Sequence, residues 1–326
     1  MEPTRALLAA AHAVLAAIAG MLGLPHPGSP PPGLPGDWYA SAPYYQVLSA
    51  GEPAPRTVMK ATGQNAFILA FILARGRQCA PAWKGTDPVS GDRKVAAVIG
   101  DIRKAGGDVA VSAGGAAGTK LGQACPTAAA TAAAYQRVIR AYRLHAFDLD
   151  LEDTEIARPG AIARELGAAR ILKAADPGLS ISVTMPGVQA GTDSAGLHLL
   201  TEARTLRFVP FTFTLMPFDH RFAGGAAQVA ALRNFHAQLE RTFGWTSGQA
   251  YEREGFSGTN GRGGPGEIFR PADFRTVLAF ARRAGLGRFT FWSVNRDRPC
   301  AKGKPPLPCS GVSQRPWEFT RITAGA

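Results

Sequence analysis

The stretch AFDLDLE, residues 146–152, alternates apolar and acidic side chains without a break. A period of two is typical of a β-strand, whose successive side chains point to opposite faces. We therefore expect Asp148, Asp150 and Glu152 on one face, with neighbouring acids separated by roughly 7 Å. Crowding three carboxylates in this way costs repulsion and desolvation. That cost indicates that the three acids have a chemical role.

On both sides of this strand, short β-rich runs alternate with Ala-, Arg- and Leu-rich stretches at helical spacing. This alternation is typical of a parallel sheet covered by helices. Strands are expected at 43–47, 65–74, 107–113, 146–152, 180–185, 209–218, somewhere between 248 and 256, and 288–294. Helices are expected at 95–105, 128–144, 159–175, 196–204, 227–242 and 272–284.

Eight strands with helices between them favour an α/β fold, specifically a (β/α)8 TIM barrel. A doubly wound sheet would give a similar alternation. The barrel is favoured because distinctive residues fall at the carboxyl ends of the expected strands, where barrel enzymes assemble their sites. These residues are Gly114, Gly115, Glu152, Asp219 and Trp292. The sequence shows no internal repeat, so we predict a single domain over residues 37–326.

The amino-terminal end differs from the rest of the chain. Arg5 precedes an apolar stretch, residues 6–24, and a Pro- and Gly-rich run follows at 25–36. We predict a signal peptide or membrane anchor over 1–24 and a linker over 25–36, with a buried helix of the fold as the alternative. The protein would then be secreted or extracytoplasmic, with possible membrane association through residues 6–24.

Export would permit disulfides, and the four cysteines allow three pairings. Cys79 and Cys125 follow neighbouring predicted strands, while Cys300 and Cys309 bracket a short Lys- and Pro-rich loop. We therefore expect these two pairs. Neither the cysteines nor the six histidines have the spacing of a metal site, so we expect no metal and no cofactor. The net charge is +12, but no basic run is interleaved with aromatic residues, and we expect no nucleic-acid binding.

Taken alone, the pattern Asp-x-Asp-x-Glu permits three types of site. Paired carboxylates could hold Mg²⁺ or Mn²⁺ for a nucleotide-sugar transferase. They could also form a buried structural network. The third type is acid catalysis at a glycosidic bond, which needs one carboxyl group protonated near neutral pH. Glu152 suits that role because it is the last acid of the strand, and the charges of Asp150 and Asp148 are expected to raise its pKa.

Four motifs resemble those of the family 18 glycoside hydrolases, the chitinases. Residues 145–152 resemble the strand-four signature D-x-x-D-x-D-x-E, and residues 112–115 resemble S-x-G-G of strand three. Residues 216–219, Met-Pro-Phe-Asp, resemble M-x-[Y/M]-D of strand six, and Trp292 resembles the tryptophan of strand eight. The motifs occur in order over most of residues 65–298.

The resemblance implies hydrolysis of β-1,4 linkages between N-acetylglucosamine units by a substrate-assisted retaining mechanism. Glu152 would protonate the leaving oxygen, Asp150 would orient the acetamido group, and Asp148 would share a proton with Asp150. Asp219 would bind the reacting sugar and Trp292 would form its apolar floor. The full set expected to bind substrate is Asp219, Trp292, Met216, Phe218, Gly114 and Gly115. The partner would be an N-acetylglucosamine-containing oligo- or polysaccharide, bound by a monomer.

Two residues depart from the family pattern. His145 occupies the position of the first Asp of the signature, and Phe218 occupies a position where many members have Tyr. Such a Tyr donates to the acetamido oxygen in the transition state. These departures leave open a non-catalytic chitin-binding lectin on the same barrel, with a metal-dependent transferase as a third possibility. Trp38, Tyr39, Tyr44, Tyr45 and Trp83 are further aromatic residues that could extend a sugar groove.

Overall fold

The computed structural model describes residues 37–301 and 308–326. The predicted signal or anchor segment at 1–24 and the predicted linker at 25–36 lie outside these residues. Among the helices of the described part, none has the length and apolar character needed to cross a membrane.

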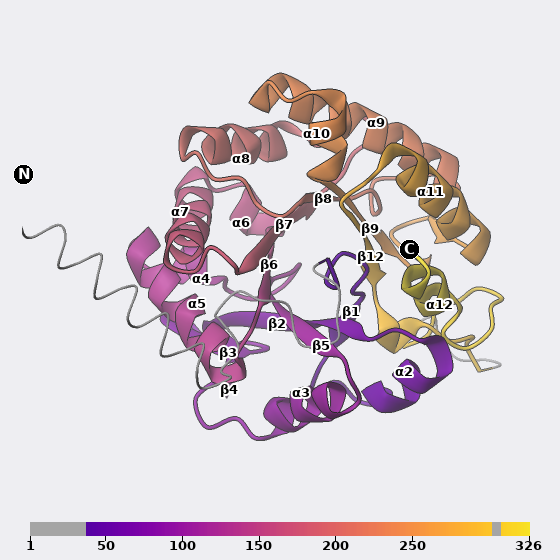
Figure 1. The fold of residues 1–326 in the computed structure, drawn as a ribbon, viewed down its shortest axis with the longest axis horizontal. Coiled ribbons are helices and arrows are strands. Elements are labelled where there is room, and N and C mark those ends of the chain that lie inside the picture. The colour runs from indigo at the N-terminus through magenta and orange to yellow at the C-terminus, as the bar shows by residue number, and fades with distance from the viewer. Residues whose placement is uncertain (1–36, 302–307) are drawn as a thin grey trace, which may run out of the picture.

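The fold is a curled parallel β-sheet with helices packed around it (Figure 1). Each strand of the curled sheet pairs in parallel with the next one in chain order. In the described residues these strands are β1 (Tyr44–Gln46), β2 (Ala66–Arg75), β5 (Asp108–Gly114), β6 (Ala146–Asp150), β7 (Ser180–Pro186), β8 (Phe213–Met216), β9 (Glu254–Thr259) and β12 (Arg288–Trp292). The predicted α/β class is confirmed.

Hydrogen bonds bring the first and last strands of the curled sheet together. The backbone N–H of Phe289 on β12 donates to the carbonyl of Ala40, just before β1, at 3.0 Å. Beyond β12, the Asn295 side chain accepts from the N–H of Gln46 at 2.7 Å and donates to its carbonyl at 2.9 Å. The sheet therefore curls back on itself, and its carboxyl ends gather at one end of the molecule.

The helices expected from the sequence are all present between the strands. They are α3 (Lys94–Lys104), α5 (Ala128–Tyr142), α7 (Pro159–Ala175), α8 (Ser194–Thr205), α9 (Gly224–Phe243) and α11 (Pro271–Ala284). Side-chain caps start two of them: Thr127 accepts from the N–H of Ala130 before α5, and Asp193 accepts from two N–H groups of α8. Shorter helices are α2 (Pro55–Thr62), α4 (Leu121–Ala124), α6 (Asp153–Ile156), α10 (Ser247–Glu252) and α12 (Glu318–Ala324).

Several elements differ from the sequence-based expectation. An antiparallel hairpin, β3 (Gln78–Trp83) and β4 (Asp87–Pro88), extends the sheet beside β2, and its prolines hid it because proline is rare in paired strands. The expected strand at 209–218 is shorter, since β8 begins only at Phe213. In the range 248–256, α10 occupies the first part. A small separate pair is β10 (Gly261–Arg262) with β11 (Ile268–Phe269).

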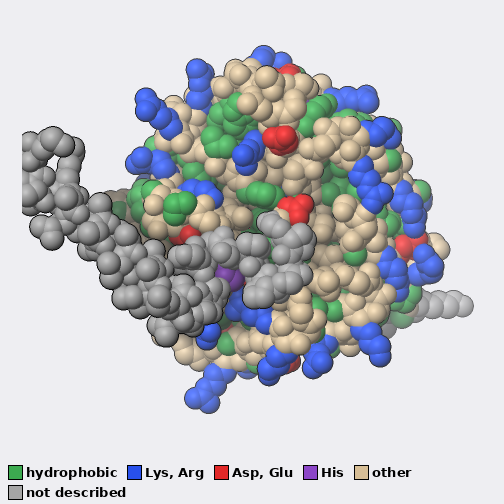
Figure 2. Space-filling view, in the orientation of Figure 1, with side chains coloured by type: hydrophobic (Ala, Val, Ile, Leu, Met, Phe, Trp, Pro, Cys, Tyr) green, Lys and Arg blue, Asp and Glu red, His purple; other side chains and the backbone are tan. Residues whose placement is uncertain are grey.

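Basic side chains do not form one patch on the face seen in Figure 2. Lys and Arg are spread around the outline of that face, with single acidic side chains among them. The net charge of +12 is thus distributed there rather than gathered.

The structure contains two disulfides, Cys79–Cys125 and Cys300–Cys309, which are the expected pairs. The first joins β3 to the end of α4 across 46 positions of sequence, and the second spans 9 positions. A cross-link that closes a longer loop removes more conformational entropy from the unfolded chain.

Replacing both cysteines of a pair by Ser should therefore destabilise the protein unequally. Loss of Cys79–Cys125 should lower the free energy of unfolding by about 4 kcal/mol, and loss of Cys300–Cys309 by about 2.5 kcal/mol, on the loop-entropy relation. Denaturant unfolding of the two double variants beside the parent protein measures the order. A larger loss from the Cys300–Cys309 pair would contradict it.

Candidate active site

A cleft of about 630 Å³ opens at the carboxyl ends of the strands. Its walls include six residues that the sequence nominated: Asp150, Glu152, Met216, Phe218, Asp219 and Trp292. Tyr44 and Phe71 line it as well. The remaining nominated residues, Asp148, Gly114 and Gly115, are not among the lining residues, and they lie in the strands beneath. The motifs therefore converge on one site.

Asp148 is the deepest of the three acids, with 0% of its surface exposed. Its carboxylate accepts hydrogen bonds from Tyr39 (3.5 Å), Tyr44 (2.8 Å), Ser112 (2.7 Å), Thr184 (3.0 Å) and Arg288 (2.9 Å). Ser112 is the serine of the S-x-G-G motif, so that motif acts here by holding Asp148. We expected Asp148 to share a proton with Asp150. The structure instead gives it donors on both oxygens, including the buried Arg288 cation.

Asp150 lies one step closer to the cleft and is 2% exposed. Burial, followed by the negative charges of Glu152 and Asp148, holds the pKa of Asp150 well above its usual range. Its Oδ1 atom is buried and has no hydrogen-bond partner among the described residues. Burial and the neighbouring negative charges therefore favour the protonated form of Asp150 over its carboxylate.

Glu152 is half-buried at the mouth of the cleft. Strand β6 ends at Asp150, so Glu152 is the residue before α6 and not the last residue of the strand. Burial raises the pKa of Glu152 to about 7, while Lys120 and a hydrogen bond with Asp150 lower it and Asp219 raises it. We expected the charges of Asp148 and Asp150 to be the cause. Burial is instead the largest cause of the raised pKa, and the hydrogen bond with Asp150 lowers the pKa.

Lys120 is a buried cation whose charge acts on both Asp150 and Glu152, and the sequence analysis did not single it out. It precedes the short helix α4, is 1% exposed, and donates from Nζ to the carbonyl of Gly118 at 3.0 Å. Its charge favours the ionised forms of Asp150 and Glu152. Nothing in its sequence context distinguishes it from surface lysines.

A second pair of buried carboxyl groups, Glu155 and Glu165, lies behind the site, and each is 0% exposed. Glu165 accepts from the hydroxyl of Tyr135 at 2.7 Å and from the N–H of Gly122. Burial raises the pKa of both carboxyl groups, and the charge of Glu165 raises that of Glu155 further. The charge of Lys120 acts on Glu155 as well, so this lysine serves both acidic groups.

Gly114, the last residue of β5, and Gly115, which follows it, make room for their neighbours. Gly114 has a positive φ of 121°, and a Cβ atom there would collide with the carbonyl of Asp150. Gly115 donates its N–H to that same carbonyl at 2.9 Å, and a Cβ there would meet the ring of Phe71. The Gly-Gly pair is therefore required for close contact with β6 and Phe71. It supports the site from beneath.

Phe71 and Trp292 form the aromatic floor of the cleft. Their rings are stacked, with centroids 5.3 Å apart and planes 12° from parallel. The Tyr44 ring lies 6.0 Å from Trp292. The other aromatic residues suggested for a sugar groove, Trp38, Tyr39, Tyr45 and Trp83, are buried. Of that group, Tyr44 is the member that lines the cleft.

Asp219 is held in place by Glu267, which sequence reasoning also missed. Asp219 has a positive φ of 62° and donates its N–H to Oε2 of Glu267 at 2.6 Å. Oε1 of the same carboxylate accepts from the N–H of Phe222 at 2.7 Å. Glu267 is 3% exposed, so its two hydrogen bonds fix the loop after β8, and Asp219 in this loop lines the cleft together with Asp150 and Glu152.

His145 lies away from the cleft, at the amino end of β6. Its Nδ1 atom is 3.2 Å from Oδ2 of Asp108, whose Oδ1 accepts from Nε of Arg103 at 2.6 Å. The replacement of Asp by His at this position therefore acts at the opposite end of the strand from the acids.

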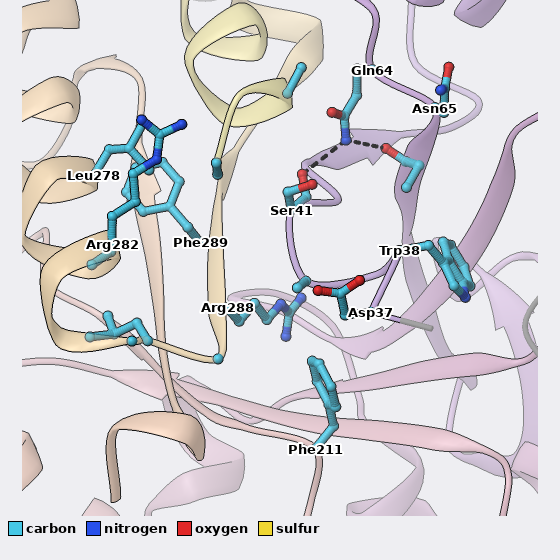
Figure 3. A pocket seen from close by; sticks show the side chains of 18 of the residues that line it. Asp37, Trp38, Ser41, Gln64, Asn65, Phe211, Leu278, Arg282, Arg288 and Phe289 are labelled. Atoms are coloured by element: carbon cyan, nitrogen blue, oxygen red, sulfur yellow. Dashed lines mark hydrogen bonds between the residues drawn. The ribbon is translucent and has the colours of Figure 1, made fainter. Parts of the chain in front are cut away.

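The described part of the chain contains no cluster of three or more His, Cys, Asp or Glu side chains arranged to hold a metal ion. A second cavity, of about 640 Å³, is separate from the three acids Asp148, Asp150 and Glu152 (Figure 3). Its walls include Gln64, which precedes β2, and Arg288, which begins β12. It therefore lies at the amino ends of the strands, opposite the cleft.

Two substitutions should shift the pKa of Glu152 in opposite directions. Lys120→Met should raise this pKa above about 7 because it removes the cation that stabilises the carboxylate. Asp219→Asn should lower it because it removes a nearby negative charge. Carbon-13 NMR titration of glutamate-labelled protein, with Glu152→Gln used for assignment, measures both shifts. Shifts of the same sign in the two variants would refute this account of the electrostatics.

No protein-family profile matches the sequence. Two curated proteins do. A probable bifunctional chitinase/lysozyme of Escherichia coli is 27% identical over 279 residues, which cover 79% of this chain and 31% of that protein. Endochitinase 11 of Metarhizium anisopliae is 26% identical over 282 residues, which cover 80% of this chain and 53% of that protein. The matched region is thus about a third and about half of these two relatives.

Solved structures show the same fold. The catalytic domain of a hyperthermophilic chitinase from Pyrococcus furiosus superposes with a TM-score of 0.78 at 24% identity, covering 87% of this chain and 93% of that one. The chain is thus similar in sequence to two curated proteins named as chitinases, and similar in fold to the catalytic domain of a third chitinase.

Proposed function

We propose that the protein hydrolyses β-1,4 linkages between N-acetylglucosamine units, in chitin or chito-oligosaccharides, by a substrate-assisted retaining mechanism. One observation carries the proposal: Glu152, with a pKa raised to about 7, lines a cleft next to Asp150, whose pKa is raised as well. A carboxyl group with this pKa can donate a proton near neutral pH. Catalytic-site mutants of the Pyrococcus furiosus chitinase, a protein of the same fold, form complexes with chito-oligosaccharides.

Glu152 gives its proton to the glycosidic oxygen as the bond from that oxygen to the anomeric carbon breaks. The acetamido oxygen of the substrate forms the new bond to the anomeric carbon, so no enzyme nucleophile is needed. Water then attacks the anomeric carbon as the bond from the acetamido oxygen to that carbon breaks, and the Glu152 carboxylate takes up the proton of the water. Because two displacements occur at that carbon, its configuration is retained.

The other residues of the cleft bind and orient the sugar in this proposal. Asp150 has a buried Oδ1 atom without a partner in the described residues, and this atom can accept from the acetamido N–H as positive charge develops. Asp219, which also lines the cleft, binds the same sugar. Trp292, already stacked on Phe71, offers its other face to the C–H groups of the ring.

We also propose that the protein acts outside the cytoplasm. Two disulfides within one chain are typical of oxidising compartments. The apolar stretch at residues 6–24, which follows Arg5, is consistent with export through a signal or anchor.

Glu152→Gln should lower kcat on chito-oligosaccharides by about 10² to 10⁴, since it removes the general acid while keeping the shape of the side chain. Glu202→Gln on the outer helix α8 is the matched control and should leave kcat unchanged. Proton NMR of the first product should show the β-anomer. An α-anomer would contradict retention. Binding of the sugar without turnover in the parent protein would contradict hydrolysis and support the lectin alternative.

Phe218→Tyr should raise kcat. Phe218 lines the cleft together with Glu152 and Asp219, and a hydroxyl there would donate to the acetamido oxygen as it attacks. A donor of this kind contributes roughly a hundredfold in rate where it is well placed. Steady-state kinetics of the variant and the parent protein measure the gain. An unchanged kcat would show that this position does not face the acetamido group.

A further inference from the structure

Arg288 is a buried cation in the interior of the curled sheet, on the side of the acids that faces away from the cleft. It begins β12 and is 1% exposed. Its Nη1 atom lies 2.9 Å from Oδ1 of Asp148 and 3.3 Å from Oγ1 of Thr214. Its guanidinium carbon lies 4.7 Å from the centre of the Tyr39 ring. Contacts from β6, β8 and the segment before β1 therefore fix the guanidinium group.

The surroundings of Asp148 suit a carboxylate and not a carboxylic acid. Both oxygens accept hydrogen bonds, and one of the donors is a guanidinium group, which can only donate. The titratable or charged groups that face Asp148 are Tyr39, Tyr44, Asp150 and Arg288. Burial raises the pKa of both tyrosines, so they remain neutral donors. Protonating Asp148 would leave Arg288 buried beside a neutral group.

We propose that Arg288 is a positioning residue that keeps Asp148 ionised and fixed, so that the exchangeable proton of the acid cluster is confined to Asp150 and Glu152. This inference rests on the proposed hydrolysis at Glu152. Asp148 then serves as a permanent negative charge beneath Asp150. Asp150 can then exchange a proton with Glu152, but not with Asp148 on the side away from the cleft.

No other hydrogen-bond acceptor in the described residues competes with Asp148 for the remaining nitrogens of Arg288. Its Nε and Nη2 atoms are buried and have no hydrogen-bond partner in the described part of the chain. The residue also lines the cavity at the amino ends of the strands, where Figure 3 shows its side chain among Asp37, Ser41 and Phe211. Among the described residues, Asp148 is the anion that forms a salt bridge with it. In the described residues Asp148 therefore supplies the charge that compensates Arg288.

The state of Asp148 can be measured without any assay of activity. Carbon-13 NMR of aspartate-labelled, full-length protein is recorded from about pH 5 to about pH 9, a range over which an ordinary Asp is ionised. Asp148→Asn assigns the resonance. We expect a carboxylate shift throughout this range in the parent protein and in Arg288→Lys. In Arg288→Met, which keeps the length but removes the charge, the resonance should become that of a protonated carboxyl at neutral pH.

Kinetics on chito-oligosaccharides supply the second readout. Arg288→Met should lower kcat at least roughly tenfold with little change in KM, and Arg288→Lys should restore most of it. If Arg288→Met does not fold, Arg288→Gln, which keeps hydrogen-bond donors but removes the charge, takes its place in both measurements. A parent resonance of Asp148 that titrates together with that of Asp150 would overturn the inference even if the protein cleaves the substrate. A parent protein without turnover would contradict the proposed function instead, and the titration would still show which state Asp148 adopts.

Discussion

The ion pair between Asp148 on β6 and Arg288 on β12 is the constraint around which the interior of the sheet is arranged. The two side chains have 0% exposed surface and come from positions 140 residues apart. Removing one partner of such a buried pair typically costs 3–5 kcal/mol, because the other charge is left uncompensated. Ser112 and Thr184, on the strands that flank β6, also donate to Asp148. The pair therefore ties the register of β5, β6 and β7 to the closing strand.

The three acids of β6 and its extension differ in function because they differ in depth. Asp148 is paired with a cation, Asp150 is buried without one, and Glu152 stands half-buried at the cleft. The same type of group therefore has three different environments: Asp148 accepts from a buried cation, burial raises the pKa of Asp150, and burial raises the pKa of Glu152 to about 7. Two-residue spacing on one strand is enough to create this gradient, since each step of a strand moves a side chain toward the rim.

The parts of the fold and site that the sequence predicts are those encoded locally. The acid–apolar alternation at 146–152 predicted a strand with its acids on one face, and the expected strand at 65–74 is present as β2. The Gly-Gly pair at the end of β5 was recognised because it belongs to a motif. The hairpin β3–β4 was missed, since Pro81 and Pro88 argue against strands, and β8 was drawn too long, because an apolar loop and an apolar strand look alike in sequence.

The residues that the sequence does not reveal are those whose importance depends on distant partners. Crowding three carboxylates predicts that a cation must lie nearby, but 36 Lys and Arg residues are available and the pattern does not say which one folds inward. Arg288 lies in an ordinary Arg-containing stretch and Lys120 in a loop. Only the closure of the sheet brings Arg288 under Asp148, and only the turn after β5 buries Lys120 behind Glu152. The acids can therefore be found from spacing alone, whereas the charges that set their protonation states become visible only in three dimensions.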